Sequence, residues 1–326
     1  MKKHALIVAS NDSYALGTLA LLNSFLRLGL QDEVDFVLAH TGWGDCLGDR
    51  VVHVRSKEAG NCILWRNQVC LDLADYYDSI ALFDADMFLT SSPMHFFGMA
   101  ASGYPVLGNE DTIVDQGAFL DHQGRKLVDR FSDRIVCAVP MFFSSTHARQ
   151  VYSRFFELHA QLSNGGDLEA INLALSSLPE ILDRAVIFPS VSFTGIHHTF
   201  LKPQTAYVTG QWRPNLATAL PVIPDAFLTT RDAMRVYSVH GKYWDRAWVD
   251  GLLLPMHTFY AHEFGLAEAH KDKWISYNTR VISEVQKIFA GLLVNGPVPV
   301  SGISSVVKPE HWDYLLQKVA GLAGRA

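Results

Sequence analysis

Short apolar runs alternate with longer stretches of helical spacing in the first part of the chain, and this alternation is the strongest constraint on the fold. The run His4–Ser10 precedes Tyr14–Leu30, where leucines recur every three or four residues. The runs VDFVLAH and VVHV follow, then a helical segment at Asn61–Tyr77 and the apolar run Ile80–Phe83. Strands that alternate with helices build a mainly parallel sheet covered by helices, so we predict an α/β fold.

The rest of the chain predicts fewer strands and more helix. Residues 188–235 are rich in Pro, Thr and Gly, which predicts long loops with short strands. We expect a main domain over residues 1–250 and a helical C-terminal extension over residues 251–326. The predicted elements are a strand at Ile135–Phe143 and helices at Ala148–Leu162, Asp167–Ser177, Lys271–Leu293 and Glu310–Leu322.

The composition and charge of the chain argue against several classes of protein. The 326 residues are 49% hydrophobic and carry a net charge of −6, so we expect no nucleic-acid partner. The most apolar long stretch, YALGTLALLNSFLRLGL, is interrupted by Asn23 and Arg27, which argues against a membrane span. The N-terminus lacks the apolar region of a signal peptide, and the four cysteines show no CxxC spacing. We expect a cytoplasmic protein with reduced thiols; peripheral membrane association stays open.

Two carboxylates follow directly on a buried strand. Asp84 and Asp86 come after Ile80–Phe83, and anions at the end of a buried strand need a neutralising partner. In an extended strand residues two apart point to the same side, so both carboxylates would face one cation. Oxygen ligands of this kind suit Mg²⁺ or Mn²⁺, and open α/β sheets bind ligands beyond the carboxyl ends of their strands. The plain alternative is a pair of solvated acids.

The same pattern has a second chemical interpretation. Haloacid-dehalogenase-type phosphatases also carry an apolar strand that ends in DxD, and their first Asp is a nucleophile. Their motif usually lies on an early strand, and they favour Thr or Gly where this chain has Phe88. A phosphatase is therefore kept as the less favoured alternative.

Five stretches together resemble the glycogenin-like family of retaining glycosyltransferases. They are VASNDSYALGTLALLNSFLR at the start, LWRNQV, FDADMF, DLEAINLAL and VYSVHGKYW. The resemblance covers about residues 5–250, and the motifs occur in the family's order. It implies a GT-A-type nucleotide-sugar-binding fold, a UDP-sugar donor and a Mn²⁺ or Mg²⁺ cofactor.

The resemblance also implies roles for particular residues. Asp167 and Glu169 would face the donor sugar or the acceptor, although Asp167 is equally suited to cap a helix. Asn11 would hydrogen-bond the base of the nucleotide, and its alternative role is that of a helix cap. Tyr14 would stack on the same base. The implied metal ligands are Asp84, Asp86 and His240. The implied donor-binding residues are Ala9, Asn11, Tyr14, Arg66, Asp84, Ala85, Gly241 and Lys242.

Single motifs among these are weak. The chain has 14 histidines, so His240 alone carries little information, and Arg66 could be a surface arginine of a helix. Gly241 would let the backbone approach a phosphate, and Lys242 would offset the phosphate charge.

The chain departs from the family pattern at three places. Leu168 replaces a glutamine, Pro140 lies where a glycine is expected, and Tyr243 replaces a proline. No acceptor tyrosine of the self-glucosylating kind can be matched.

We therefore predict a Mn²⁺-dependent retaining glycosyltransferase that moves a hexose from a UDP-sugar. The acceptor stays open among a glycan, a lipid-linked sugar and a protein. The alternative from another class is a nucleotide-sugar-binding protein without transfer activity.

Overall fold

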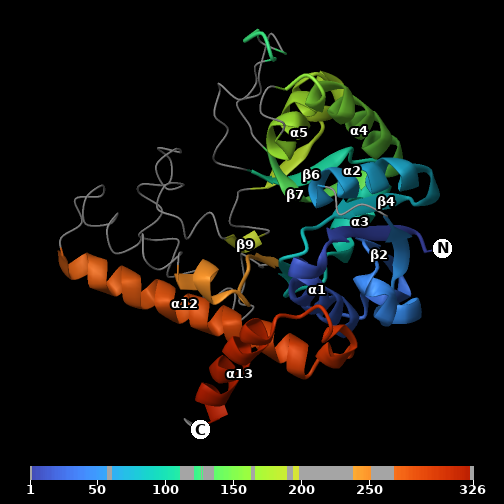
Figure 1. Ribbon diagram of the computed structural model, residues 1–326. Helices are drawn as coiled ribbons and strands as arrows, with labels where there is room; N and C mark the ends of the chain where they lie inside the picture. The colour runs from blue at the N-terminus through green and yellow to red at the C-terminus, as the bar shows by residue number, and fades with distance from the viewer. Residues whose placement is uncertain are drawn as a thin grey trace. The chain divides into compact units, whose positions relative to one another are not determined.

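The computed structural model describes residues 2–56, 61–110, 121–125, 127, 136–162, 166–188, 194–197, 238–250 and 268–323 (Figure 1). The chain divides into two compact units, each described by itself below. One of the points at which the chain passes from the first unit to the second lies between Ala85 and Asp86. The predicted boundary near residue 250 adjoins residues outside the described part and stays a prediction. The first unit comprises Met1–Asn11, Gly29–Ala85 and Ser92–Phe193, and the second Asp12–Leu28, Asp86–Ser91 and Thr194–Ala326.

The first unit is built on a seven-stranded sheet in the order β3-β2-β1-β4-β7-β6-β8. Strand β1 pairs in parallel with β2 and β4, β2 with β3, and β6 with β8, whereas β7 runs antiparallel to both β4 and β6. The predicted mainly parallel, mixed α/β sheet is therefore confirmed. The strands are β1 His4–Ser10, β2 Val34–His40, β3 Val52–Arg55, β4 Ser79–Leu82, β6 Val106–Glu110, β7 Val136–Ser144 and β8 Val186–Phe188.

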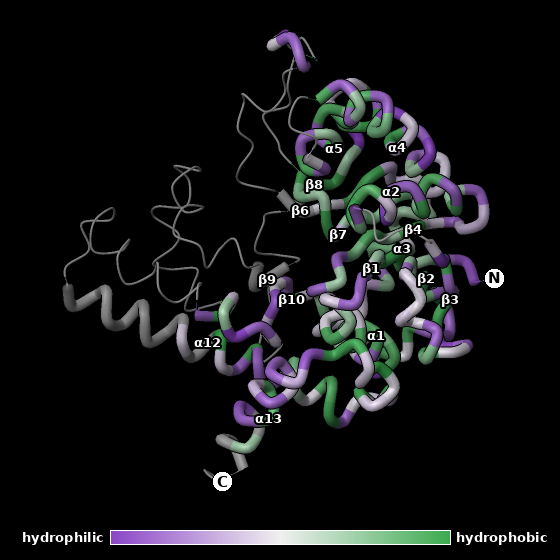
Figure 2. Tube along the Cα trace, in the orientation of Figure 1, coloured by the Kyte–Doolittle hydropathy of each residue, from purple (hydrophilic) through white to green (hydrophobic). Residues whose placement is uncertain are grey.

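Helices cover this sheet because its central strands are apolar on both sides. Every residue of β1 and β2 is buried, as expected for parallel strands between two layers of helix. Helix α3 packs on β4 and β7, and α4 packs against α2 and α5. Figure 2 shows these strands mostly in hydrophobic colours. The helices are α2 Cys62–Leu73, α3 Met94–Ala101, α4 Ser145–His159, α5 Asp167–Ser176 and α6 Pro179–Leu182.

The proline in the middle of the sheet lies at an irregular point of the pairing. Met141 of β7 is opposite Gly108, but Val136 is opposite Glu110, so the register shifts between these pairs. Pro140 lies between Met141 and Val136, where a strand tolerates a residue without an N–H.

The second unit combines helices with a small sheet in the order β5-β10-β9. Helix α1 packs against β5 and α12, and the two long C-terminal helices predicted from sequence are both present. The elements are α1 Ala15–Arg27, β5 Met87–Leu89, β9 Thr194–His197, β10 Ser238–His240, α12 Glu268–Val294 and α13 Pro309–Ala323. Short 3₁₀ helices in the two units are Asp12–Tyr14, Leu30–Asp32, Trp43–Arg50, Ala74–Tyr76 and Val300–Ile303.

The C-terminal extension is attached to α1 by one buried amide. The Asn23 side chain donates to the carbonyls of Leu292 and Val298, at 2.8 and 3.0 Å, and accepts from the Val298 N–H at 2.9 Å. A Cβ on Gly296 would meet the Asn23 amide nitrogen at 2.1 Å, so this close approach requires glycine. Arg27 adds bonds to the carbonyls of Gly291 and Asn295.

Most of the predicted loop region at 188–235 lies outside the described residues. Within the described part of the chain, none of the helices is both long and apolar enough to span a bilayer. The four cysteines are free thiols.

Candidate active site

The two carboxylates of the DxD motif lie in a turn between two sheets. Strand β4 ends at Leu82, and the Phe83 N–H still bonds the Ile7 carbonyl of β1 at 3.0 Å. Asp84 and Asp86 follow before the chain enters β5. The expected extended conformation at these residues was wrong. The chain instead turns at Ala85 and Asp86 and then enters β5, which pairs with β10 rather than with a strand of the larger sheet.

In the first unit, Arg66 contacts two carboxylates, one just after the end of β4 and one at the start of α5. Its Nη1 forms an ion pair with Asp84, and its Nη2 lies 3.3 Å from Asp167 Oδ2. The Arg66 side chain is only 2% exposed, so the surface reading of this residue was wrong. Burial works to lower the pKa of the guanidinium, but Asp84 and Asp167 beside it raise that pKa, so Arg66 carries its charge.

Asp167 is the first residue of α5. The helix cap is Gly166, which makes no side-chain capping bond, so the capping role expected for Asp167 was wrong. Its carboxylate is instead directed to Arg66, while an acid in the first turn is favourable to the helix dipole. Glu169 is half-buried two residues further along α5. Leu168 contributes its backbone carbonyl to the Asn172 amide at 2.8 Å.

In the second unit, Asp86 and His240 form a buried pair. Asp86 Oδ1 lies 3.0 Å from His240 Nε2, and the two residues are 8% and 5% exposed. The pairing of β5 with β10 places His240 opposite Met87, the residue after Asp86. The Gly241 N–H also bonds the Asp86 carbonyl at 2.8 Å. Two motifs far apart in the sequence are thereby held together by a strand pair.

Asp84 is joined to Asp86 through the buried Ala85 alone, which keeps its carboxylate near this pair. Asp86 and His240 each offer one ligand atom within the second unit, and Asp84 precedes Asp86 by two residues at the end of the first unit. Two carboxylate oxygens and one imidazole nitrogen suit Mn²⁺, and less well Mg²⁺. This donor set fits the cation that the sequence predicts.

Tyr14 and Lys242 also lie together in the second unit. Lys242 Nζ is 4.6 Å from the centroid of the Tyr14 ring, and the Trp244 ring meets Tyr14 edge-on at 6.1 Å. Gly241 has φ of 149°, and a Cβ there would meet the Trp248 ring at 2.5 Å. Packing on Trp248 is therefore a reason for this glycine that the sequence analysis did not find.

The polar cluster before α1 does not cap that helix. The N-cap position is Tyr14, whose side chain makes no capping bond. Asn11 is half-buried after the end of β1, and its carbonyl accepts from the Ser10 hydroxyl at 3.2 Å. Ala9 is buried in β1. Their contacts with a nucleotide stay predictions.

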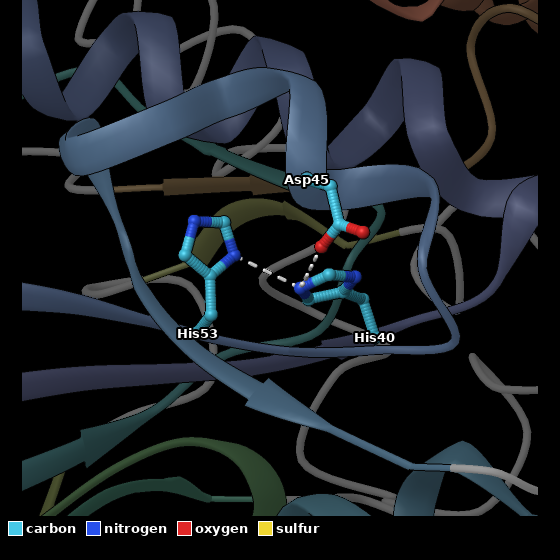
Figure 3. Close-up of side chains that lie close together, drawn as sticks. All are labelled: His40, Asp45 and His53. Carbon is cyan, nitrogen blue, oxygen red and sulfur yellow. Dashed lines mark hydrogen bonds and ion pairs between the residues drawn. The ribbon is translucent and has the colours of Figure 1, made fainter.

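A second group of possible ligands, which sequence reasoning missed, lies at the ends of β2 and β3. Figure 3 shows His40, Asp45 and His53 directed toward one another. His40 Nε2 is 2.9 Å from His53 Nδ1 and 3.8 Å from Asp45 Oδ1. His53 Nε2 lies 2.9 Å from the Gly48 carbonyl. A His on each of two neighbouring strands was the only sequence signal.

The hydrogen bonds of His40 determine whether this second group can bind a metal ion. His40 Nδ1 accepts the N–H groups of Gly42 and Gly44, at 3.1 and 3.2 Å. The neutral ring therefore carries its proton on Nε2, the atom that would have to bind a metal. Asp45 Oδ1 is also paired with Arg55 at 2.8 Å. The group is a hydrogen-bonded network that holds the loop at Trp43–Arg50 in place, and it does not suit a cation.

One comparison with solved structures supports the predicted fold. No protein-family model matches the chain, and no curated protein matches its sequence. Among solved structures the chain is similar to the apo structure of WbbM, a bifunctional glycosyltransferase, with a TM-score of 0.50 and 13% identity. The match covers 78% of this chain and 49% of that one, so the chain corresponds to about half the length of WbbM.

A second solved structure is the galactosyltransferase LgtC in complex with donor and acceptor sugar analogues. Its TM-score is 0.48 at 15% identity, over 75% of this chain and 91% of that one. The fold of this chain is the GT-A type, an α/β sheet flanked by helices, as predicted. Identities this low carry the fold and no finer property.

Proposed function

We propose that the chain is a metal-dependent glycosyltransferase that transfers a hexose from a UDP-sugar with retention of anomeric configuration. The observation that carries the proposal is His240 beside Asp86, at 3.0 Å. The sequence resemblance assigns these two residues to one cation, although they lie 154 residues apart (240 − 86). A GT-A-type fold around them supports the same reading.

Asp84, Asp86 and His240 hold the divalent cation in this proposal. The cation, when bound, neutralises the diphosphate and stabilises its departure as a Lewis acid. Before binding, Arg66 balances Asp84 and His240 lies against Asp86, so the carboxylates are kept in place in the free protein. Such preorganised charge lowers the reorganisation needed when the donor arrives.

The residues near the DxD turn suit positioning rather than covalent catalysis. The ion pair with Arg66 holds the Asp167 carboxylate in one orientation, where its oxygens can accept hydrogen bonds from sugar hydroxyls. Leu168 offers no polar side chain where the family has a glutamine. We therefore favour front-face displacement, in which the leaving diphosphate takes the proton of the acceptor hydroxyl. Orientation of donor and acceptor then supplies most of the rate enhancement.

The proposed acceptor is of the carbohydrate type. The proposed location of the protein is the cytoplasm. The free cysteines fit a reducing compartment. Nucleic acid is an unsuitable partner for a chain of net charge −6.

A screen of UDP-sugars tests the proposal without knowledge of the acceptor. Slow release of UDP from one donor is expected with Mn²⁺ and is absent with EDTA. Asp86→Asn abolishes the release, and Asp183→Asn, at an exposed carboxylate of the same protein, leaves it unchanged. UDP-sugar binding with no hydrolysis and no transfer to an acceptor panel would instead identify a binding protein. Release of phosphate from simple phosphomonoesters would identify a phosphatase.

A further inference from the structure

The second unit contains a cavity of about 290 Å³ whose walls come from three distant stretches of chain. One wall is the turn around Tyr14, the second is Lys242–Asp245, and the third is Val306–His311 at the start of α13. The first two stretches carry Tyr14 and Lys242, which the sequence resemblance assigns to the donor. The third belongs to the C-terminal extension, to which the proposed function assigns no role.

Cationic side chains from two of these walls line the same space. Lys242 lies over the Tyr14 ring, and Lys308 contributes a second ammonium from the opposite end of the sequence. Lys308 directly precedes Pro309, the first residue of α13, so the positive end of that helix dipole lies beside it. These charges favour an anionic ligand.

The acidic residues of the cavity wall are already engaged or exposed. Asp245 accepts the Trp248 N–H at 3.2 Å through Oδ1, and its Oδ2 lies 4.0 Å from His311 Nε2. Asp12 is exposed to solvent. Two carboxylates therefore line the cavity beside the two lysines, and its suitability for an anion rests on the lysines and on the start of α13.

The extension also supports the turn that carries Lys242. The Gln286 side chain of α12, 1% exposed, donates to the Tyr243 carbonyl at 3.3 Å and bonds the Tyr314 hydroxyl at 2.7 Å. Phe289 stacks on Trp244, with ring centroids 5.6 Å apart. Gln286 thereby links the turn that carries Lys242 to Tyr314 of α13, the helix that Lys308 precedes.

We propose that the C-terminal extension completes the donor site and that Lys308 binds the diphosphate of the nucleotide together with Lys242. This inference rests on the proposed function, because it takes the ligand to be a nucleoside diphosphate. The volume of the cavity is close to the lower end of the range for small-ligand pockets, about 300 Å³. Two lysines suit phosphate oxygens as point charges without demanding a bidentate geometry.

The test compares ligands that differ only in phosphate number. Calorimetry measures the affinities of UDP, UMP and uridine for the full chain with Mn²⁺ present. Lys308→Ala is expected to weaken UDP binding about 10-fold, UMP binding less, and uridine binding not at all, because one charge-assisted hydrogen bond to phosphate is lost. Lys308→Arg is expected to retain most of the affinity. Lys318→Ala removes an exposed lysine of the same helix and serves as the matched control.

The outcomes separate the two proposals. Wild-type protein that does not bind UDP overturns the proposed function. Wild-type protein that binds UDP while Lys308→Ala binds it equally well overturns the role of Lys308 alone. If Lys308→Ala lost affinity for UDP and for uridine equally, the role of Lys308 would also be overturned. That result would indicate a change in the shape of the cavity rather than a lost phosphate contact.

Discussion

The guanidinium of Arg66 forms an ion pair with the carboxylate of Asp84, the first acid of the DxD motif. Arg66 is almost fully buried on α2, and its other terminal nitrogen lies beside Asp167. An internal arginine is thus the neutralising partner of one of the two carboxylates in the free protein. His240 lies beside the other, Asp86. Each acid of the DxD motif therefore has a nitrogen partner in the free protein, although Arg66 shares its single charge between Asp84 and Asp167.

Removal of the Arg66 charge should destabilise the fold strongly. Arg66→Met leaves two carboxylates without their buried partner, which costs about 3–5 kcal/mol of the free energy of unfolding. Urea denaturation at pH 7 measures this loss. The control is Arg149→Met, which breaks an exposed pair with Asp75 and should cost at most about 1 kcal/mol. Similar losses for the two variants would show that Arg66 contributes no more than a surface pair.

UDP binding should require a divalent cation and both acids of the turn. Asp84→Asn and Asp86→Asn each remove a metal-binding charge, so the increase in UDP affinity on adding Mn²⁺ should largely disappear. His240→Ala should have the same effect in smaller measure, because one nitrogen ligand is lost. Calorimetry with Mn²⁺ and with EDTA measures the difference. Equal UDP affinity of the wild-type protein in the two conditions would contradict the metal site.

The fold could be predicted where structure is local. β1, α1 and β2 follow from apolar runs and helical spacing, and the predicted His4–Ser10 matches the observed strand. The conformation of Asp84 and Asp86 could not, because it depends on β5 pairing with β10 far along the chain. A strand pattern read within a short window cannot include that partner.

The site was predicted in part for the same reason. The five motifs named the residues, and the pairing of Asp86 with His240 agrees with them. The contact between Arg66 and Asp167 was missed, since nothing in the sequence relates the middle of α2 to the start of α5. The His40 and His53 network was missed because a hydrogen bond between neighbouring strands leaves no spacing signal.

The attachment of the C-terminal extension should depend on Asn23. Asn23→Leu leaves the Val298 N–H and carbonyl and the Leu292 carbonyl without their buried partner, and the cost should be about 3 kcal/mol. Asn295→Ala changes an exposed side chain of the same loop and should stay within about 0.5 kcal/mol. Urea denaturation followed by circular dichroism compares the two variants. A neutral Asn23→Leu would mean that apolar packing and the Arg27 bonds hold the extension without the Asn23 amide.

The His40 network should make the fold sensitive to acid. Burial, and next the neighbouring His53, lower the pKa of His40 below the ordinary value of 6.5, while Asp45 raises it to a smaller extent. Protonation would also cost the bonds that Nδ1 accepts from Gly42 and Gly44. Because the folded pKa is the lower one, the unfolded chain takes up the proton first as pH falls. Stability from this group is therefore full above pH 6.5 and falls below it, by at most about 1.4 kcal/mol per pH unit.

His40→Asn isolates that contribution, because the Asn side-chain oxygen can accept the same two N–H groups without titrating. The variant should lose some stability at pH 8, where its bond to His53 is missing. Between pH 6.5 and 5 its free energy of unfolding should decline less steeply than that of the wild type. Burial also lowers the pKa of His4 and His147, so part of the decline should remain. His122→Asn, at an exposed position, should follow the wild-type curve. Parallel curves for His40→Asn and the wild type would show that His40 does not resist protonation in the folded state.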